Sequence, residues 1–411
     1  MKRRAVRPLF AATLLADVAI SFEEARACVL QTVLQNSCTE LAKLAAAEGR
    51  ILAEEITADR DYPPFDRSAR DGFAIRSGDT PGDLRVAGEI RAGDVPSHVA
   101  GPGEAIEIMT GAPMPQGADA VIMVEHVARD GDRVVIDREV KAGDNLTPRG
   151  TEAKRGAVLI ERGRRIGFAE IALLAMVGKT CVSVYRQPRV AIVPTGDEIV
   201  DIETAPGDFQ IRNSNAWSLA AQVKRANAIP VVMPIARDEY ESTRGAIERA
   251  FAESDLVLLS GGVSAGKYDI VERVLADLGA KFFFDRVKIQ PGQPVVFGVA
   301  GEKFFFGLPG NPISTMVTFE LFARAAIDRL SGLESAPLPL MRAKLAREFK
   351  HKGGLTRFLP ALVSDDGSTV TPMSWHGSGD IPVVARANAF LVADADRESW
   401  NAGDDIRVLL R

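Results

Sequence analysis

The chain has 411 residues, of which 46% are hydrophobic and 26% are charged, and its formal net charge is −5. This length exceeds what one ordinary core holds, so we expect roughly two to four domains. The mildly acidic balance, with no polybasic stripe, argues against nucleic acid as the main partner.

The cysteines and histidines exclude several kinds of chemistry. Cys28, Cys38 and Cys181 form no Cys-x-x-Cys pair, so the sequence supports neither a disulfide framework nor a zinc cluster. The histidines show no metal-ligand spacing, and no catalytic Ser-His-Asp or Cys-His pattern occurs. No stretch approaches the roughly 20 apolar residues of a membrane span, so we expect no membrane association. A reducing, cytoplasmic setting follows as the expected location.

The N-terminal part predicts helices, an extended arm and a β lobe. Asp17 interrupts a short apolar run near the start, so we interpret this run as an arm or helix rather than an export signal. Ser21 and Glu24 form a capping-box pattern before an amphipathic helix, and a second helix is expected over about 39–47. Prolines 63 and 64 indicate an extended arm. The N-terminal region is expected to cover 1–187, with a β lobe inserted over about 78–156.

From residue 189 the strand and helix patterns alternate strictly. This alternation predicts a doubly wound parallel sheet over 188–332. The expected strands are 190–193, 230–235, 256–259 and 303–308, and the expected helices include 215–226 and 240–252. Prolines 337 and 339 mark a hinge before a small β domain over 338–411. The fold class is therefore multidomain α/β.

Two loops at the ends of expected strands have the composition of ligand-binding loops. Residues 260–266 read SGGVSAG, and residues 309–312 read PGNP before another helix. Glycines expose bare backbone N–H groups to a ligand, and hydroxyls suit phosphate contact. Either loop alone could be a tight turn, because neither is a dinucleotide fingerprint or a Walker loop. Two such loops together indicate a site, since ligands of open α/β sheets bind at the carboxyl ends of strands.

Acidic side chains are expected on the same rim. Glu198, Asp238 and Asp269 each lie at or just beyond a strand end, where convergence would suit a hard cation such as Mg²⁺. The alternative for Asp238 and Asp269 is helix N-capping. Ser214 and Asn215, near a helix N-terminus, are expected to add a polar anion seat.

The order of seven motifs resembles that of the MoeA-type molybdopterin molybdenumtransferases, which include the E domains of gephyrin. The motifs are FDRSARDGFAIR, MTGAPMPQGADAVIMVE, PTGDEIV, NSN, LSGGVSAGKYDIV, PGQPVVFG and GLPGNPISTM. The resemblance implies elongated subunits that form a homodimer, with the active cleft between the α/β domain of one subunit and the N-terminal region of the other. It also implies that molybdate is inserted into the dithiolene of adenylylated molybdopterin, with Mg²⁺ assistance and release of AMP and the molybdenum cofactor.

The resemblance gives roles to individual residues. Asp71 and Thr110 match site residues lent by the partner subunit, and Glu198, Asp238 and Asp269 match acidic positions for metal binding and nucleotide cleavage. The positions that match seats for the pterin, its phosphate and the oxyanion are Gly261, Gly262, Ser264, Pro309, Gly310, Asn311, Pro312, Arg357 and Ser378. Expected protein partners are a molybdopterin adenylyltransferase and the proteins that mature molybdoenzymes.

One departure from the family pattern affects the expected oxyanion binding, and three alternative functions are also open. Gln290 and Gln293 stand where the family often has lysines, which predicts weaker oxyanion binding or an altered preference between molybdate and tungstate. The same α/β domain could serve a molybdopterin adenylyltransferase or a CinA-like nucleotide hydrolase, although the N-terminal motifs speak against both. A non-enzymatic scaffold is the remaining alternative, and the three acidic positions argue against it.

Overall fold

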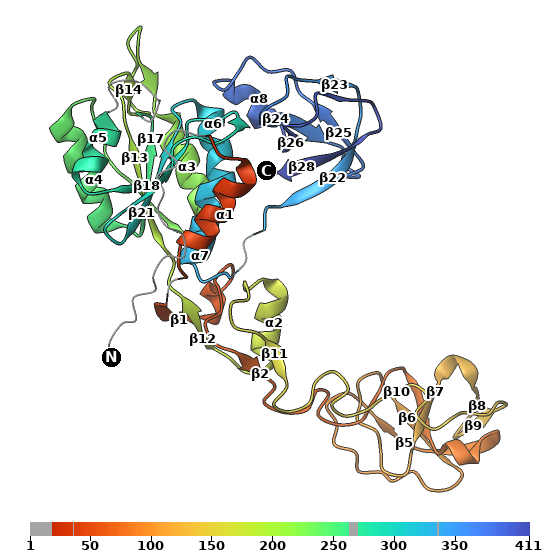
Figure 1. Cartoon of the computed structure of the whole chain (residues 1–411). Coiled ribbons are helices and arrows are strands. Elements are labelled where there is room, and N and C mark those ends of the chain that lie inside the picture. The colour runs from red at the N-terminus through yellow and green to blue at the C-terminus, as the bar shows by residue number, and fades with distance from the viewer. Residues whose placement is uncertain (1–18, 36, 263–269, 335–336) are drawn as a thin grey trace. The chain divides into compact units, whose positions relative to one another are not determined.

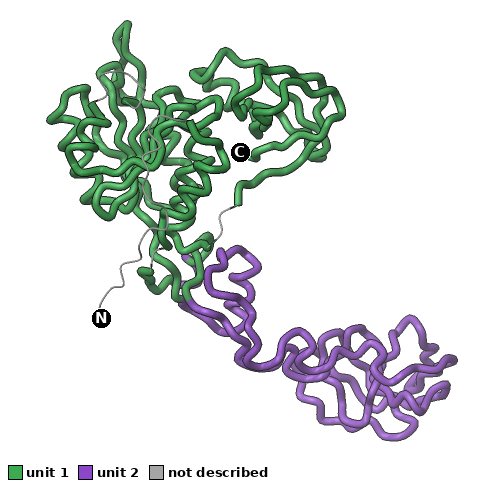
Figure 2. Tube along the Cα trace, viewed as in Figure 1, with its two compact units in different colours: residues 1–42, 47–53, 183–411 green, residues 43–46, 54–182 purple. Residues whose placement is uncertain are grey.

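The computed structural model describes residues 19–35, 37–262, 270–334 and 337–411. The chain divides into two compact units, one of residues 1–42, 47–53 and 183–411 and the other of residues 43–46 and 54–182 (Figure 2). Among the described helices, none combines the length and the apolar character that crossing a membrane would require.

A six-stranded sheet forms the core of the second unit (Figure 1). Five of its strands lie within the range expected for the β lobe, about 78–156, and the sixth, β4, precedes that range. In spatial order its strands are β7 (Ala120–Met123), β4 (Gly72–Ile75), β6 (Glu104–Ile108), β5 (Gly82–Ile90), β9 (Arg133–Ile136) and β8 (Ala128–Asp130). Strand β4 runs antiparallel to both of its neighbours. Its alternate side chains enter two separate cores, Phe73 on one face and Ala74 on the other, so both faces of this sheet are buried.

Smaller elements complete the second unit. They are the pairs β2 (Ile56–Thr57) with β11 (Val158–Ile160) and β3 (Arg67–Ser68) with β10 (Leu146–Thr147), the helix α2 (Phe168–Met176), and the turns η1 (Leu44–Ala46), η2 (Ser77–Asp79) and η3 (Val124–His126).

The expected helix over 39–47 is wrong. This stretch forms strand β1 (Thr39–Lys43), which pairs with β12 (Cys181–Tyr185), followed by the short turn η1. The alanine-rich sequence favours a helix locally, but pairing with a strand that lies far along the chain overrides that propensity. The capping box is confirmed: Ser21 and Glu24 cap helix α1 (Phe22–Thr32) reciprocally.

The α/β domain contains a six-stranded sheet in the first unit. In spatial order its strands are β16 (Ile229–Val232), β13 (Arg189–Pro194), β17 (Leu256–Ser260), β21 (Lys303–Leu308), β20 (Val296–Ala300) and β18 (Lys281–Phe284). The strands from β16 to β21 are parallel, as expected. Strands β20 and β18 add an antiparallel edge that the sequence analysis did not anticipate.

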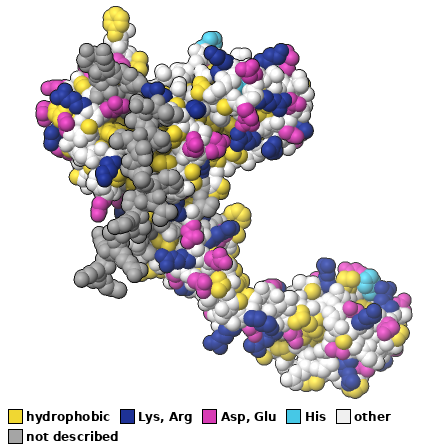
Figure 3. Space-filling view, in the orientation of Figure 1, with side chains coloured by type: hydrophobic (Ala, Val, Ile, Leu, Met, Phe, Trp, Pro, Cys, Tyr) yellow, Lys and Arg dark blue, Asp and Glu magenta, His cyan; other side chains and the backbone are white. Residues whose placement is uncertain are grey.

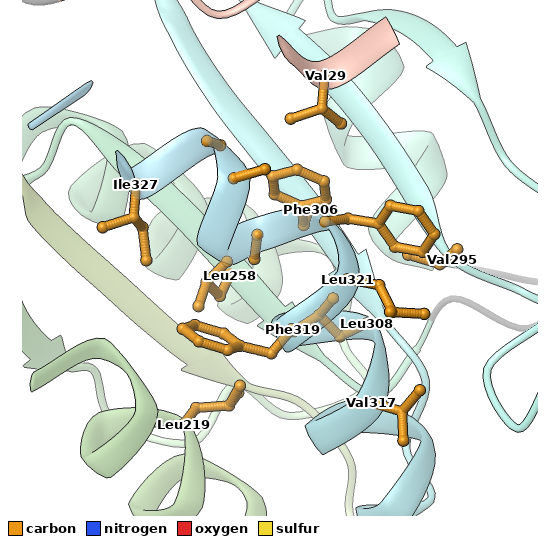
Figure 4. Packing of buried hydrophobic residues seen from close by; sticks show 14 of the residues in the cluster. Val29, Leu219, Leu258, Val295, Phe306, Leu308, Val317, Phe319, Leu321 and Ile327 are labelled. Carbon is orange, nitrogen blue, oxygen red and sulfur yellow. The ribbon is translucent and has the colours of Figure 1, made fainter. Parts of the chain in front are cut away.

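Helices cover both faces of this sheet. They are α3 (Ser214–Arg225), α4 (Tyr240–Glu253), α5 (Ile270–Asp277), α6 (Pro312–Thr318), the π-helical segment η4 (Phe319–Ala323) and α7 (Arg324–Leu330). Along β17, Leu258 packs in the core on the α3 and α6 side, whereas Val257 packs in the core on the α4 and α5 side. Figure 4 shows Leu258 beside Phe319 and Leu219 in the first of these cores. Two buried faces explain the continuous apolar pattern of β17.

The C-terminal strands form a second sheet in this unit, and this second sheet closes on itself. Strands β24 (Thr356–Val363), β25 (Thr369–Pro372), β22 (Leu340–Leu345), β28 (Asp405–Leu410) and β26 (Ala389–Ala393) pair in that order, and β26 pairs again with β24. The remaining elements are β14 (Ile199–Val200), β15 (Ile211–Arg212), β19 (Ile289–Gln290), β23 (Phe349–Lys350), β27 (Ser399–Trp400) and α8 (Ile381–Arg386). Phe358 and Phe390 join the same core as Phe22 and Phe322, so the C-terminal domain packs on the α/β domain and on α1.

Candidate functional site

Three loops meet at the carboxyl ends of the parallel strands. The backbone N–H of Thr195, after β13, donates to the Ser260 carbonyl at 3.1 Å. The N–H of Gly261, after β17, donates to the Leu308 carbonyl at 3.2 Å, at the start of the third loop. Adjacent parallel strands therefore bring PTGDE, SGG and PGNP side by side, as the sequence analysis expected.

Glycine occurs in these loops for different structural reasons at different positions. Gly261 has φ +98°, and a Cβ there would lie 2.8 Å from the Thr195 carbonyl oxygen, so the fold itself requires glycine. A Cβ on Gly310 would meet only the Gly261 Cα among described atoms, at 3.7 Å, which is an ordinary contact. Gly262 is exposed and also has positive φ. With respect to the described residues, Gly310 thus leaves open space above bare backbone, which is what a close ligand contact needs.

The amide of Asn215 joins two of the loops. Its Nδ2 donates to the Ser260 hydroxyl at 3.1 Å and to the Gly310 carbonyl at 2.8 Å. A carbonyl only accepts, so this contact fixes the orientation of the amide. The Oδ1 atom is buried and has no hydrogen-bond partner in the described structure. Asn215 therefore offers a ligand an acceptor, which suits an N–H or O–H group rather than the anion that the sequence analysis assigned to it.

Helix α3 begins one residue earlier than expected, and Ser214 is its first residue. The N-cap is Asn213, whose side chain accepts from the Ala216 N–H at 3.1 Å. Ser214 is exposed and lies in the first turn. Its assignment to cofactor binding stays a prediction.

The PGNP loop leads directly into α6. Asn311 is the N-cap residue and Pro312 is the first helical residue, an arrangement favoured at helix starts. The Thr315 hydroxyl donates to the Pro309 carbonyl and the Thr315 N–H donates to the Asn311 carbonyl, so the loop is held from inside the helix. The Ile313 N–H donates to the Ser378 carbonyl at 2.9 Å. The C-terminal domain thus supplies a contact at this helix N-terminus.

Arg357 and Gln290 are also neighbours. Strand β19 pairs in parallel with β24, and Gln290 stands opposite Arg357 in this register. The Thr356 N–H donates to the Lys288 carbonyl at 3.0 Å on the same edge. The segment in which Gln290 replaces an expected lysine therefore lies beside the arginine predicted to contact the oxyanion.

The acidic residues lie on the outer part of the same rim. Glu198 and Asp238 are exposed, and neither carboxylate forms a hydrogen bond or an ion pair with another described residue. The Asp238 N–H donates to Asp197 Oδ1 at 3.2 Å. The loop that carries Glu198 and the loop that carries Asp238 are therefore joined through Asp197 and not through Glu198. Among the described residues, no group of three acidic, histidine or cysteine side chains is placed to hold a metal. Asp269 and Ser264 lie outside the described residues, so their roles stay predictions.

Arg237 is a residue of the rim that the sequence analysis missed. Its guanidinium donates to the carbonyls of Gly196, Asp197 and Ile199 at 3.1–3.4 Å, so it holds the loop that carries Glu198. The one sequence feature that pointed to Arg237 was its position directly before Asp238, which was predicted to be a site residue. A single arginine in a loop has no pattern that would reveal three backbone partners.

Asp71 and Thr110 form a contact of their own in the second unit. Asp71 directly precedes β4, and Thr110 follows the end of β6, its antiparallel neighbour. The Thr110 N–H donates to Asp71 Oδ1 at 2.6 Å, and the Thr110 hydroxyl donates to the same oxygen at 2.9 Å. These two bonds hold the pKa of the exposed Asp71 carboxyl below its ordinary value, and the bond from the backbone N–H has the larger effect. The structure thus brings together the two residues expected to act in trans.

Replacing Thr110 by valine should raise the pKa of Asp71 without restoring its ordinary value. Valine removes the hydroxyl donor but keeps the backbone N–H, which is the larger cause of the lowered pKa. Because the folded pKa is depressed, the stabilisation from ionised Asp71 is present at neutral pH and is lost as pH falls through that pKa. NMR titration of the Asp71 carboxyl should show this loss beginning at higher pH in Thr110→Val. Thr110→Ser, which keeps a hydroxyl, should titrate like the original protein, and equal titration of all three would contradict the assignment.

Comparisons with known proteins cover most of the chain. Residues 20–178 match the family described as MoeA N-terminal region (domain I and II), residues 191–329 match the probable molybdopterin binding domain, and residues 342–410 match MoeA C-terminal region (domain IV). The Bacillus subtilis molybdopterin molybdenumtransferase is 35% identical over 385 residues, covering 90% of each chain. The Nostoc protein of the same name is 36% identical, covering 90% of this chain and 88% of its own.

A solved structure supports the same relationship. The crystal structure of a molybdopterin biosynthesis moeA protein from Pyrococcus horikoshii OT3 superposes with a TM-score of 0.83 at 29% identity. It covers 96% of this chain and 100% of the other. The resemblance drawn from the seven motifs and the multidomain α/β fold are thereby confirmed.

Proposed function

The chain belongs to the MoeA family of molybdopterin molybdenumtransferases, and we propose that its three strand-end loops hold adenylylated molybdopterin while molybdate enters the dithiolene. The reaction attaches molybdenum to the two dithiolene sulfurs and releases AMP and the molybdenum cofactor. The observation that carries this assignment to the loops is the open backbone at Gly310, between Gly261 and the start of α6. Such a place suits a phosphate group.

Different loop residues would bind different parts of the ligand. The backbone N–H groups of Gly262, Gly310 and Asn311 would bind phosphate oxygens. Gly261, whose N–H donates to the Leu308 carbonyl, and the two prolines, which have no N–H, would shape the loops. Asn215 Oδ1, which lacks a partner, would accept a hydrogen bond from an N–H or O–H of the pterin, ribose or adenine. Ser214 and Ser264 would add hydroxyl contacts. In this arrangement the donors bind the anionic part and the single acceptor orients the uncharged part.

A magnesium ion would bind at the acidic rim. Glu198 and Asp238 are exposed carboxylates on neighbouring loops, and Mg²⁺ characteristically takes one or two carboxylates together with water and phosphate oxygens. Asp269 would complete the set. The ion would neutralise charge as the phosphate linkage to AMP breaks. Arg237, which donates to three carbonyls of the Glu198 loop, would keep that carboxylate in place.

Arg357 and Ser378 would receive the oxyanion. Arg357 stands opposite Gln290 on β19, and the Ser378 carbonyl accepts from the Ile313 N–H in the first turn of α6, so the C-terminal domain supplies both residues. Molybdate is a dianion, and charge-assisted bonds from arginine would bind it more tightly than the neutral amides of Gln290 and Gln293.

A second copy of the chain would complete each site with Asp71 and Thr110. Phe168 and Phe209, which are 88% and 93% exposed in the single chain, are candidates for burial in this association. Figure 3 shows hydrophobic atoms at the tip of the projection between β14 and β15, the segment that holds Phe209. A molybdopterin adenylyltransferase would supply the substrate, and maturation proteins of molybdoenzymes would receive the product in the cytoplasm.

The other functions considered are not favoured. An adenylyltransferase or a CinA-like hydrolase would account only for the α/β domain, whereas this chain also matches the MoeA regions on both sides of it. A purely structural role is not favoured either, because the relatives are named as transferases.

The direct test is incubation of the purified protein with adenylylated molybdopterin, Mg²⁺ and molybdate. We expect AMP release together with reconstitution of a cofactor-free molybdoenzyme. Asp269→Ala and Glu198→Ala should each lose both signals, by about a hundredfold or more. AMP release without reconstitution would instead indicate a hydrolase, and the absence of both signals would contradict the proposed function.

A further inference from the structure

Two side-chain amides on one face of helix α3 join it to the chain that runs from the PGNP loop through α6. Asn215 and Gln222 are seven residues apart, which is almost two helical turns, so their side chains point to the same side. Asn215 Nδ2 donates to the Gly310 carbonyl at 2.8 Å, before α6 begins. Gln222 Nε2 donates to the Met316 carbonyl of α6 at 3.1 Å. The two helices are thus joined at the loop and again roughly 10 Å farther along α3.

The second of these joints includes the π-helical segment η4. Gln222 Nε2 also donates to Glu320 Oε1 at 2.9 Å, and Glu320 lies in η4. The other carboxylate oxygen of Glu320 accepts from Arg324 at 3.3 Å. From helix α1, Arg26 donates to the Leu321 carbonyl at 2.7 Å. Segment η4 is therefore tied to α3 by Gln222 and to α1 by Arg26, and short π-helical segments of this kind frequently occur at functional sites.

One atom of the Gln222 amide is buried without a partner. The bond from Nε2 to the Met316 carbonyl fixes the orientation of the amide, because a carbonyl only accepts. Its Oε1 atom is then left buried with no hydrogen-bond partner in the described part of the chain. Such an atom costs stability, and an apolar side chain of the same shape would avoid that cost. Stability alone thus does not account for a glutamine at this position.

The position of Asn215 in the site depends on how α3 lies against α6. The Gly310 carbonyl and the Ser260 hydroxyl accept from its Nδ2 at 2.8 and 3.1 Å, and this orientation leaves Oδ1 as the acceptor for a ligand. A shift of α3 along α6 by about 1 Å would break the bond to Gly310 and release the amide. The two bonds of Gln222, one to backbone and one to a carboxylate, oppose such a shift.

We propose that Gln222 is a positioning residue, which together with Glu320 sets the register of α3 against α6 and thereby holds the acceptor of Asn215 towards the substrate. Gln222 acts through Asn215, because it lies almost two turns away from the loops. The link to substrate binding rests on the proposed function, in which Asn215 Oδ1 accepts from adenylylated molybdopterin. Loss of the Gln222 amide should therefore weaken the binding of adenylylated molybdopterin and not that of molybdate.

The first test measures the Asn215 side chain directly in Gln222→Met, which keeps the length of the side chain and removes its amide. In protein whose asparagines carry an NMR-active nitrogen isotope, the Asn215 amide signal is identified by its absence in Asn215→Ala. We expect its amide protons to exchange with solvent at least about tenfold faster in Gln222→Met. The matched control is Arg26→Met, which removes the bond from α1 to the same π-helical segment and should leave this exchange unchanged.

Two variants of Glu320 keep the test independent of how well Gln222→Met folds. Glu320→Gln retains an oxygen acceptor for Gln222, so the Asn215 amide should exchange as in the original protein. Glu320→Met removes that acceptor, whereas the Met316 carbonyl still accepts from Gln222. The exchange should therefore be faster than in the original protein and slower than in Gln222→Met.

Kinetic measurements test the link to the substrate. In Gln222→Met, KM for adenylylated molybdopterin should rise about tenfold, whereas kcat and KM for molybdate should change by less than about threefold. A general loss of folded protein would instead lower kcat and leave both KM values unchanged. In the Asn215→Ala background, Gln222→Met should cause no further rise in KM, because the residue through which Gln222 acts is already absent.

The outcomes separate this inference from the proposed function. Equal exchange of the Asn215 amide in Gln222→Met and in the original protein would overturn the positioning role, whatever the activity. Additive effects of the two substitutions on KM would also overturn it, because Gln222 would then act independently of Asn215. Absence of insertion by the original protein would refute the proposed function, whereas the exchange measurement would still decide whether Gln222 positions Asn215.

Discussion

A heterodimer of one Asp71→Ala subunit and one Glu198→Ala subunit should show about half the activity of the original dimer, although each variant is inactive as a homodimer. In the proposed arrangement, Asp71 of one subunit and Glu198 of the other serve one site. One site of this heterodimer then carries both substitutions, and the second site carries neither. Co-expression with two affinity tags and sequential purification would isolate the heterodimer, and AMP release would measure its activity.

The inverse heterodimer is the decisive control. It combines a subunit that carries both substitutions with an unchanged subunit, so its composition is the same as that of the first heterodimer. If the sites are shared, each site of the inverse heterodimer contains one substitution, and the protein should be inactive. Half activity in this control, with none in the first heterodimer, would show that each subunit supplies Asp71 and Glu198 to its own site. A monomer in sedimentation would refute the shared site directly.

Local sequence signals predicted the parts of the fold that depend on nearby residues. The capping box of Ser21 and Glu24 and the strand from 303 to 308 follow from short patterns that tertiary contacts reinforce. The strand-end loops could also be predicted, because parallel strands place their carboxyl ends on one edge. The expected helix over 39–47 failed because its partner strand lies at 181–185, a distance over which periodicity carries no information.

The same distinction applies to the candidate site. Glycine-rich loops and acidic residues at strand ends are visible in sequence, and the structure places Gly261 and Gly310 together. The direction of a side chain is not visible. Asn215 was expected to bind an anion, but bonds to Ser260 and Gly310 use its donors and leave an acceptor. The pairing of Gln290 with Arg357 likewise depends on a two-residue strand that no periodicity reveals.

Gly310→Ala should reduce activity by on the order of a hundredfold while leaving stability almost unchanged. In the free protein the new methyl group would make only an ordinary contact, 3.7 Å from Gly261 Cα, so the free energy of unfolding should change by less than about 0.5 kcal/mol. In the complex, the methyl group would occupy the space proposed for a phosphate. Thermal unfolding and AMP release, measured on the same preparation, would separate the two effects.

Two other glycines distinguish ligand contact from damage to the fold. Gly261→Ala would place a methyl group 2.8 Å from the Thr195 carbonyl at φ +98°, so it should lose activity together with about 1–3 kcal/mol of stability. Gly279, after α5, has φ +73° and open space around it, so Gly279→Ala should lose about 1–2 kcal/mol of stability from backbone strain yet keep its activity. If Gly310→Ala retained full activity, the phosphate would not lie against this loop. If Gly310→Ala instead lost activity only in proportion to its loss of stability, Gly310 would have a structural role. The open backbone at Gly310 would then no longer locate the substrate.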